Sequence, residues 1–329
     1  MANPILVEVT RGSLVESIHR GSIAIADAEG AIRFALGDIQ TPVYARSSLK
    51  PIQALVLIES GAAQAFGLSD EEVALACASH SGEPMHTERV AAWLARIGCS
   101  ERDLACGPQA PRHEPTLEAM LRRGDKPTRL HNNCSGKHSG FLTVARHWNV
   151  ATAGYEHIDH PVQKAVATSL RELSGVEELP WGVDGCAVPN FALPLGGFAR
   201  ALAKLAGGRT PGAPRIVRSM TSHPELVGGT GRACTMLIRA TAGRVAVKTG
   251  AEGVYAGIFP ERGLGIALKI DDGATRASET VIAAILDKLG VLGDGGREFL
   301  AAPVLNTRGA NVGERRPATA LSQIDLAGL

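Results

Sequence analysis

Segments typical of strands occur near both ends of the chain, and a long helix-rich stretch separates them. Short β-branched runs, ILVEVT, LVESIHRGSIAIAD and AIRFAL, fill most of the first 36 positions. Ala- and Leu-rich segments dominate from about residue 46 to residue 230, and they favour helices. Further runs then follow, CTMLIRAT, RVAVKTG, GVYAGIF and LGIALKI, and each is typical of a strand. This order requires a sheet assembled from two distant parts of the chain.

We therefore expect an α/β fold with a largely antiparallel sheet and a mostly helical middle insertion. The sheet should come from about residues 1–45 and 231–290, and the insertion from about residues 46–230. Strands that adjoin in sequence connect by tight turns, which give antiparallel pairs. A helix is expected over about residues 275–289, whereas the Gly-, Asn- and Arg-rich tail gives no clear pattern. Residues 1–329 are expected to form one composite domain.

Charge and hydropathy exclude several classes of function. Lys plus Arg number 34 and Asp plus Glu number 33, so the formal charge of +1 gives no global attraction to nucleic acid or to an anionic membrane. No apolar run approaches the roughly 20 residues of a membrane helix, and the start shows no export signal. We expect a cytoplasmic protein with a small-molecule partner. Its six cysteines are too sparse for a disulfide framework and should be thiols or metal ligands.

The segment ARSSLKP contains the one Ser-x-x-Lys of the sequence, Ser47 and Lys50. Pro51 is tolerated only in the first turn of a helix, so a helix should begin at about Ser47 or Ser48. Ser47 would then lie at the helix N-terminus, where developing negative charge is favoured, with Lys50 on the same face. A neutral lysine can remove the serine proton and create a nucleophile. The alternative is an ordinary N-cap serine followed by a solvent-exposed lysine.

Two further segments carry groups that suit serine chemistry. Lys248 begins a Lys-Thr-Gly triplet at the end of RVAVKTG, and Ser-x-x-Lys with Lys-Thr-Gly is the pairing of penicillin-recognising serine hydrolases. The Ser-Asp-Asn element of those enzymes is absent, and CASHSGE stands in its place. Ser79 or Ser81 in that segment could relay protons to a leaving group. Alternatively, Lys248 is an exposed strand-end lysine and CASHSGE merely a helix C-terminus.

Two Gly-bearing segments contain cysteines. HNNCSGKHSG, which begins at His131, should form a tight loop at a helix N-terminus, where a carboxylate could bind. A phosphate-binding Gly-x-x-x-x-Gly-Lys motif is absent. WGVDGCAVPN places Asp184 and Cys186 in a second expected loop. Cys134 and Cys186 lie too far apart in sequence for a zinc-finger spacing, so inert buried thiols remain the alternative to a metal pair.

Taken together, ARSSLKP, CASHSGE, NNCSGKH, WGVDGC and the strand with Lys248 resemble the Rhizobium-type, or class 3, L-asparaginases of the asparaginase II family. The opening VEVTRGSLVESIHRG and the stretch HPELVGGTGRACTM extend the resemblance over nearly the whole chain. The resemblance implies a serine β-lactamase/glutaminase-like fold, a homodimer, and hydrolysis of L-asparagine to L-aspartate and ammonia through a serine acyl-enzyme.

The resemblance also assigns roles to single residues. It implies that Ser47 is the nucleophile, Lys50 and Lys248 its activating lysines, and Ser79 a second catalytic serine. It implies one zinc ion per chain on Cys134, Lys137 and Cys186. Within the same motifs, the candidates for substrate contacts are Arg46, His80, Asn133 and Asp184.

Two other readings remain possible on the sequence. A β-lactamase or peptidoglycan peptidase would share the nucleophile, but such enzymes need the export signal that the start lacks. A non-catalytic zinc-binding protein would use Ser47 only as a helix cap.

Overall fold

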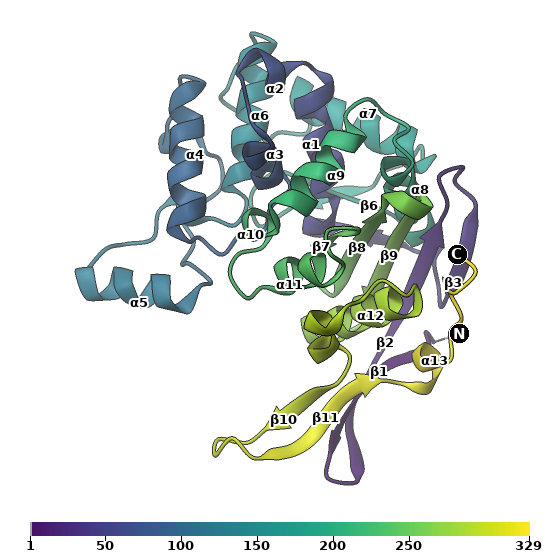
Figure 1. The fold of residues 1–329 in the computed structure, drawn as a ribbon. Helices are drawn as coiled ribbons and strands as arrows, with labels where there is room; N and C mark the ends of the chain where they lie inside the picture. The colour runs from purple at the N-terminus through teal and green to yellow at the C-terminus, as the bar shows by residue number, and fades with distance from the viewer. Residues whose placement is uncertain (1) are drawn as a thin grey trace. The chain divides into compact units, whose positions relative to one another are not determined.

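The structure, a computed structural model, describes residues 2–329 and contains two compact units. The sheet unit comprises the residues up to Ser48 together with Leu193–Gly207 and Met236–Leu329. The helical unit comprises Leu49–Ala192 and Gly208–Thr235. Figure 1 labels most helices and strands of both units.

The sheet unit is built on an eight-stranded sheet. The strand order is β10-β11-β1-β2-β9-β8-β7, with β3 paired to β2, and every pair is antiparallel. The strands are β1 (Ile5–Arg11), β2 (Leu14–Ala26), β3 (Ile32–Leu36), β7 (Ala246–Thr249), β8 (Val254–Phe259), β9 (Leu264–Ile270), β10 (Ala302–Leu305) and β11 (Asn311–Pro317). The expected antiparallel sheet from both parts of the chain is confirmed.

Helices α8 (Leu195–Ala206) and α12 (Thr275–Lys288) cover this sheet. Helix α8 packs on β2 and β9, and α12 packs on β1, β8 and β9. Gly265 of β9 permits the close approach of α8, because a Cβ there would lie 2.1 Å from the backbone nitrogen of Ala203. The core of the unit therefore lies between the buried half of β2, its neighbours and these helices.

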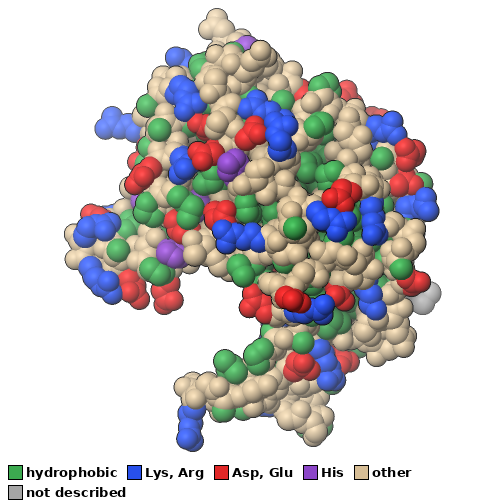
Figure 2. Space-filling model, in the orientation of Figure 1, with side chains coloured by type: hydrophobic (Ala, Val, Ile, Leu, Met, Phe, Trp, Pro, Cys, Tyr) green, Lys and Arg blue, Asp and Glu red, His purple; other side chains and the backbone are tan. Residues whose placement is uncertain are grey.

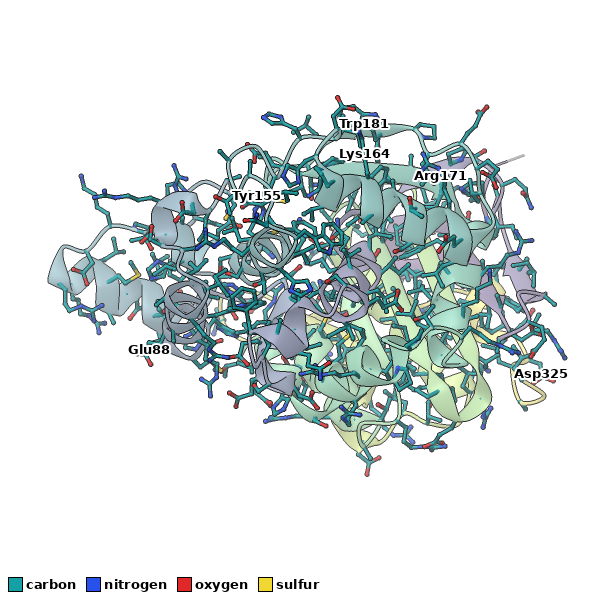
Figure 3. All side chains as sticks on the ribbon, turned by 90° about the horizontal axis from the view of Figure 1, so that it is seen from above. Glu88, Tyr155, Lys164, Arg171, Trp181 and Asp325 are labelled. Atoms are coloured by element: carbon teal, nitrogen blue, oxygen red, sulfur yellow. The ribbon has the colours of Figure 1, made fainter. Side chains whose placement is uncertain are left out.

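The helical unit is built around one buried helix, α6 (Ser135–His147), which packs against α1, α3, α4 and α7. The helices around it are α1 (Lys50–Glu59), α2 (Ala62–Ala65), α3 (Asp70–Ala76), α4 (Pro84–Arg96), α5 (Glu114–Arg123), α7 (Pro161–Ser174), α9 (Ala213–Ser222) and α10 (Pro224–Val227). Gly136 sets the contact with α3, since a Cβ there would lie 2.3 Å from the carbonyl oxygen of Leu75. Figure 3 shows Lys164 and Arg171 on the solvent side of α7.

Several expected elements differ from the structure. CTMLIRAT is not a strand but part of helix α11 (Ala233–Ala240), because a short, mostly buried apolar run does not distinguish the two by periodicity. The α-helix after ARSSLKP begins at Lys50, and Ser47 lies in the preceding 3-10 turn η1 (Arg46–Leu49).

Two expected loops are also more regular than the sequence suggested. Residues from Ser135 onward belong to α6, so only the first part of HNNCSGKHSG is loop. WGVDGCAVPN forms an antiparallel hairpin of β5 (Trp181–Val183) and β6 (Pro189–Pro194), with a turn between them. The tail carries β10, β11 and the short helix α13 (Thr319–Ser322).

Within residues 2–329, helices long and apolar enough to cross a bilayer are absent. On the face drawn in Figure 2, Lys and Arg side chains alternate with Asp and Glu side chains. That face shows no broad patch of one sign, in keeping with the near balance of charges in the sequence.

Candidate active site

The Ser47 segment lies in the sheet unit, and its two serines have different surroundings. Ser48 is fully buried, and its hydroxyl donates to the carbonyl oxygen of Ala45. Ser47 is only partly buried. Arg46 has a φ of 51°, a left-handed conformation that is costly for a residue with a side chain and that clusters at functional sites. The turn therefore gives Ser47, and not Ser48, access to a ligand.

The end of β7 lies directly against this turn. A Cβ added to Gly250 would lie 3.0 Å from the Ala45 carbonyl oxygen and 3.3 Å from the Ser48 backbone nitrogen. The close contact explains why a glycine follows Lys248 and Thr249 at this place. Lys248 is 1% exposed, and its amine donates to the Thr249 carbonyl oxygen at 2.7 Å. It is thus a buried lysine, not an exposed strand-end residue.

Lys50 lies in the first turn of α1 in the helical unit and is 1% exposed. Its amine donates to the Ser79 hydroxyl oxygen at 3.1 Å and to the carbonyl oxygens of Ala78 and Asn133. Ser79 itself is buried. A serine hydroxyl can donate as well as accept, so a neutral Lys50 amine could take a proton from Ser79 along the same contact. The fold thus places two predicted site residues, Ser79 and Asn133, around the amine of a third, Lys50.

His80 is buried and is held by contacts on both ring nitrogens. Gly82 N–H donates to Nδ1 at 3.2 Å, so the ring proton lies on Nε2, 2.9 Å from the Ser135 hydroxyl oxygen. The ring stacks on His86 with centroids 4.8 Å apart. Burial, followed by the neighbouring His86 and Lys50 charges, lowers the pKa of His80 well below its ordinary value. His80 is therefore neutral and links the CASHSGE segment to the start of α6.

A second cluster in the helical unit joins the two cysteine segments. Cys134 immediately precedes α6, Lys137 lies in its first turn, and Cys186 lies in the turn between β5 and β6. The Lys137 amine lies 3.0 Å from the Cys186 sulfur, and Asp184 Oδ2 lies 3.7 Å from the same sulfur. Cys134, Lys137 and Cys186 are buried. Residues separated widely in sequence thus meet at one polar site.

The charges of this cluster follow from its contacts. The hydrogen bond from the Cys134 thiol lowers the pKa of Cys186 to about 5, and the Lys137 ammonium adds to the effect against the opposing effect of burial. The same hydrogen bond and burial raise the pKa of Cys134 to about 12. Burial acts to lower the pKa of Lys137, but the two sulfurs raise it overall. At neutral pH the cluster is one thiol, one thiolate and one ammonium group.

The Cys134 and Cys186 sulfurs and the Lys137 amine are the possible metal ligands of this cluster. Among residues 2–329, no group of three His, Cys, Asp or Glu side chains is arranged to hold a metal ion. A metal bound here would therefore need the Lys137 amine beside the two sulfurs. Two thiolates and a nitrogen donor suit zinc, provided that Lys137 loses its proton.

Two buried groups near these sites were not among the predicted site residues. Cys106 is buried, and burial followed by the charges of Cys134 and Cys186 raises its pKa to about 12. Glu83 closes CASHSGE and is a buried carboxylate hydrogen-bonded to Thr230. Its proximity in sequence to Ser79 was the available hint, but its partner lies in a distant segment.

Comparisons with known proteins agree with this architecture. The sequence model of a family described as L-asparaginase II matches residues 7–317. A search of curated proteins gave no match. The solved native form of Mglu is 14% identical with a TM-score of 0.51, over 88% of this chain and 69% of that one. A β-lactamase (Mb2281c) from Mycobacterium bovis is 13% identical with a TM-score of 0.45, over 82% and 93%. The likeness to Mglu concerns the fold alone, and it confirms the expected fold class.

Proposed function

The chain belongs to the L-asparaginase II family, and from this premise we propose that it hydrolyses L-asparagine to L-aspartate and ammonia through an acyl-enzyme on Ser47. The observation that carries the proposal is the buried contact between the Lys50 amine and the Ser79 hydroxyl. Lys50 follows Ser47 by three positions, so the chain places a nucleophile candidate directly before this amine–hydroxyl pair.

The proposed reaction has two halves. In the first, the Ser47 oxygen attacks the side-chain amide carbon while its proton passes to a neutral lysine amine. The tetrahedral intermediate then expels the amide nitrogen, which takes up a proton relayed through Ser79 and leaves as ammonia. In the second half, water attacks the ester carbon, and Ser47 regains its proton as aspartate leaves.

Lys248 is proposed as the second activating lysine. Its burial and the contact of its strand end with the Ala45–Ser48 turn support this role. A buried amine close to a developing oxyanion stabilises that charge more strongly than an exposed amine does, because water is excluded.

Fixed polar groups would hold the rest of the substrate. The Arg46 guanidinium suits the α-carboxylate, and the Asp184 carboxylate suits the α-ammonium group. Asn133 offers an amide beside the carbonyl oxygen that accepts from Lys50. We assign His80 to holding the CASHSGE segment, because both of its ring nitrogens already have protein partners.

We further propose that Cys134, Lys137 and Cys186 bind zinc. The meeting of the two sulfurs and the amine supports this assignment. A zinc ion bound there would supply a fixed positive charge able to orient a polar group of the substrate. Lys137 would give up its proton on binding, as ligands generally must. The homodimer implied by the resemblance stays a prediction.

Ammonia release tests the proposed function. Purified protein should release ammonia from L-asparagine, and the Ser47→Ala variant should not. A slowly turned-over amide or ester should leave one acyl group on Ser47 that mass spectrometry can locate. An active Ser47→Ala variant, or wild-type protein without activity on L-asparagine, would contradict the proposal.

A further inference from the structure

Ser79 lies in an irregular segment between α3 and α4, so the fold holds it by individual contacts and not by a helix or strand. Its backbone N–H donates to the carbonyl oxygen of Val227 at 3.0 Å. The position of Ser79 therefore depends on Val227, the last residue of α10, which the Gly228–Thr230 segment follows directly. Both segments belong to the helical unit.

The Gly228–Thr230 segment packs closely against Ser81, two residues after Ser79. Gly229 has a φ of 113°, and a Cβ there would lie 1.6 Å from the Ser81 hydroxyl oxygen. The Ser81 hydroxyl also lies 3.1 Å from the Gly228 carbonyl oxygen. A side chain at Gly229 would thus push the segments apart, and glycine is required on both steric and conformational grounds.

One carboxylate joins these segments. Glu83 is 4% exposed, and its Oε1 accepts from the Ser81 hydroxyl at 3.0 Å and from the Thr230 N–H at 2.9 Å. Its Oε2 accepts from the Thr230 hydroxyl at 2.7 Å. Burial acts to raise the pKa of Glu83, but the hydrogen bonds from Thr230 and Ser81 lower it overall. The carboxylate is therefore ionised at neutral pH and uses both oxygens.

The backbone of Glu83 is itself fixed. Its N–H donates to His86 Nδ1 at 3.2 Å, so the His86 proton lies on Nε2 and is donated to the Glu225 carbonyl oxygen at 3.0 Å. His86 in the first turn of α4 is thus tied to Glu225, the second residue of α10. Loss of the carboxylate would leave this tie, the Ser81–Gly228 contact and the Thr235 hydroxyl on the Gly229 carbonyl oxygen, but it would remove both hydrogen bonds that Thr230 donates to Glu83.

We propose that Glu83 is a positioning residue for Ser79. Its carboxylate holds the Gly228–Thr230 segment against Ser81, and the Val227 carbonyl that precedes this segment then fixes Ser79 beside the Lys50 amine. This role rests on the proposed function, because it matters only if Ser79 relays protons. An error of about 1 Å in such a relay can lower the rate on the order of a hundredfold.

Glu83→Gln is the central variant, because it keeps the size, removes the negative charge and replaces the oxygen that accepts from the Thr230 hydroxyl with an NH2 group that cannot accept. Thr230→Val removes the hydroxyl donor from the other side, and Thr230→Ser restores it. The matched control is Glu72→Gln, a buried carboxylate in the same unit that caps α3 through Ser69 and pairs with Arg96. Each variant is assayed for kcat and KM on L-asparagine, thermal stability, and hydrogen–deuterium exchange of residues 78–83 and 227–230.

We expect Glu83→Gln and Thr230→Val to lower kcat by about 10- to 100-fold with KM within about threefold, and to speed exchange in both segments. Thr230→Ser and Glu72→Gln should keep kcat within about threefold. If hydrogen–deuterium exchange is unchanged in Glu83→Gln, the carboxylate does not hold the two segments together. If exchange is faster but kcat is unchanged, Glu83 does not position Ser79 for catalysis. An equal loss of kcat in Glu72→Gln also overturns it, since general destabilisation would then explain the effect. Inactive wild-type protein rejects the proposed function, whereas active wild type with fully active Glu83→Gln rejects this inference alone.

Discussion

The Lys50 amine lies 3.1 Å from the Ser79 hydroxyl oxygen, although 29 positions separate the two residues in the chain. The contact arises because α1 and the segment after α3 are packed in one unit around α6. A buried amine is costly unless it is hydrogen-bonded, and the three oxygen atoms around the Lys50 amine supply those hydrogen bonds.

Replacing Lys50 by methionine should abolish turnover. Methionine fills a similar volume but cannot take up the Ser47 proton, so kcat should fall by at least about a hundredfold, the lower end for loss of a general base. Ammonia release from L-asparagine measures the effect, and circular dichroism verifies the fold. Lys164→Met, on the solvent side of α7, is the control and should retain activity. A Lys50→Met enzyme with a tenth of wild-type activity would argue against a lysine base.

The two neighbouring serines should differ sharply. Ser47→Ala should lower kcat at least about a thousandfold, because the acyl-enzyme cannot form. Ser48→Ala loses a buried hydrogen bond to Ala45 and should cost about 0.5–1.5 kcal/mol of unfolding free energy with turnover largely kept. Urea denaturation and ammonia release separate the two effects. The reverse pattern would make Ser48 the nucleophile.

Purified protein should contain about one zinc ion per chain, bound by two thiolates and an amine. Cys134→Ser and Cys186→Ser should each lose the metal, whereas Cys99→Ser should keep it because Cys99 lies outside the cluster. Elemental analysis after dialysis measures the content. Full zinc in the Cys134→Ser, Cys186→Ser double variant would remove this site from consideration.

The metal-free protein should contain a thiolate at unusually low pH. The pKa of Cys186 is lowered from 9.0 to about 5, so its thiolate should be present at neutral pH and disappear as the pH falls through about 5. Ultraviolet thiolate absorbance of chelator-treated protein follows this titration. Cys134→Ala should move the midpoint upward, because the Cys134 thiol donates the hydrogen bond that favours the thiolate most. A Cys186 midpoint near 9 in the wild type would contradict the charge assignment.

L-Asparagine should be hydrolysed far better than L-glutamine. Polar groups that bind the α-amino and α-carboxyl groups would fix the distance between the substrate amide carbon and the Ser47 oxygen. One extra methylene moves the amide carbon past the position of attack. A misplacement of about 1 Å can lower the rate by about a hundredfold. The ratio of kcat/KM for the two amides measures this preference. Equal values would indicate a broader specificity and a less rigid grip.

The sheet could be predicted from the sequence because its strands carry continuous or alternating apolar runs between turn residues. Helix α11 could not be predicted, because most residues from Ala233 onward are apolar and buried, so the sequence shows no clear helical periodicity. The strands β10 and β11 were missed for other reasons: β10 is a short apolar run that is partly exposed, and β11 is mostly polar, so neither gives a clear alternation.

Residue spacing alone could predict the site only where its residues share a short motif, and the other site residues were proposed from the family resemblance. Ser47 and Lys50 lie within one turn, so spacing was sufficient to propose them. The meeting of Cys134 with Cys186 depends on how α6 packs near the β5–β6 turn, and neither segment specifies the other. The link between Glu83 and Thr230 is likewise a tertiary contact, made by a carboxylate that resembles an ordinary helix N-cap in sequence.

The pairing of β1 with β11 has a consequence for how the chain folds during its synthesis. Val7 pairs with Pro317, so β1 receives this neighbour only after the whole stretch between the two strands has been made. Until then β1 exposes an unpaired backbone edge of the kind that recruits other chains. Contacts of such long sequence separation also form slowly. Nascent chains should therefore depend on holding chaperones, and truncation before Asn311 should favour aggregation over a smaller folded product.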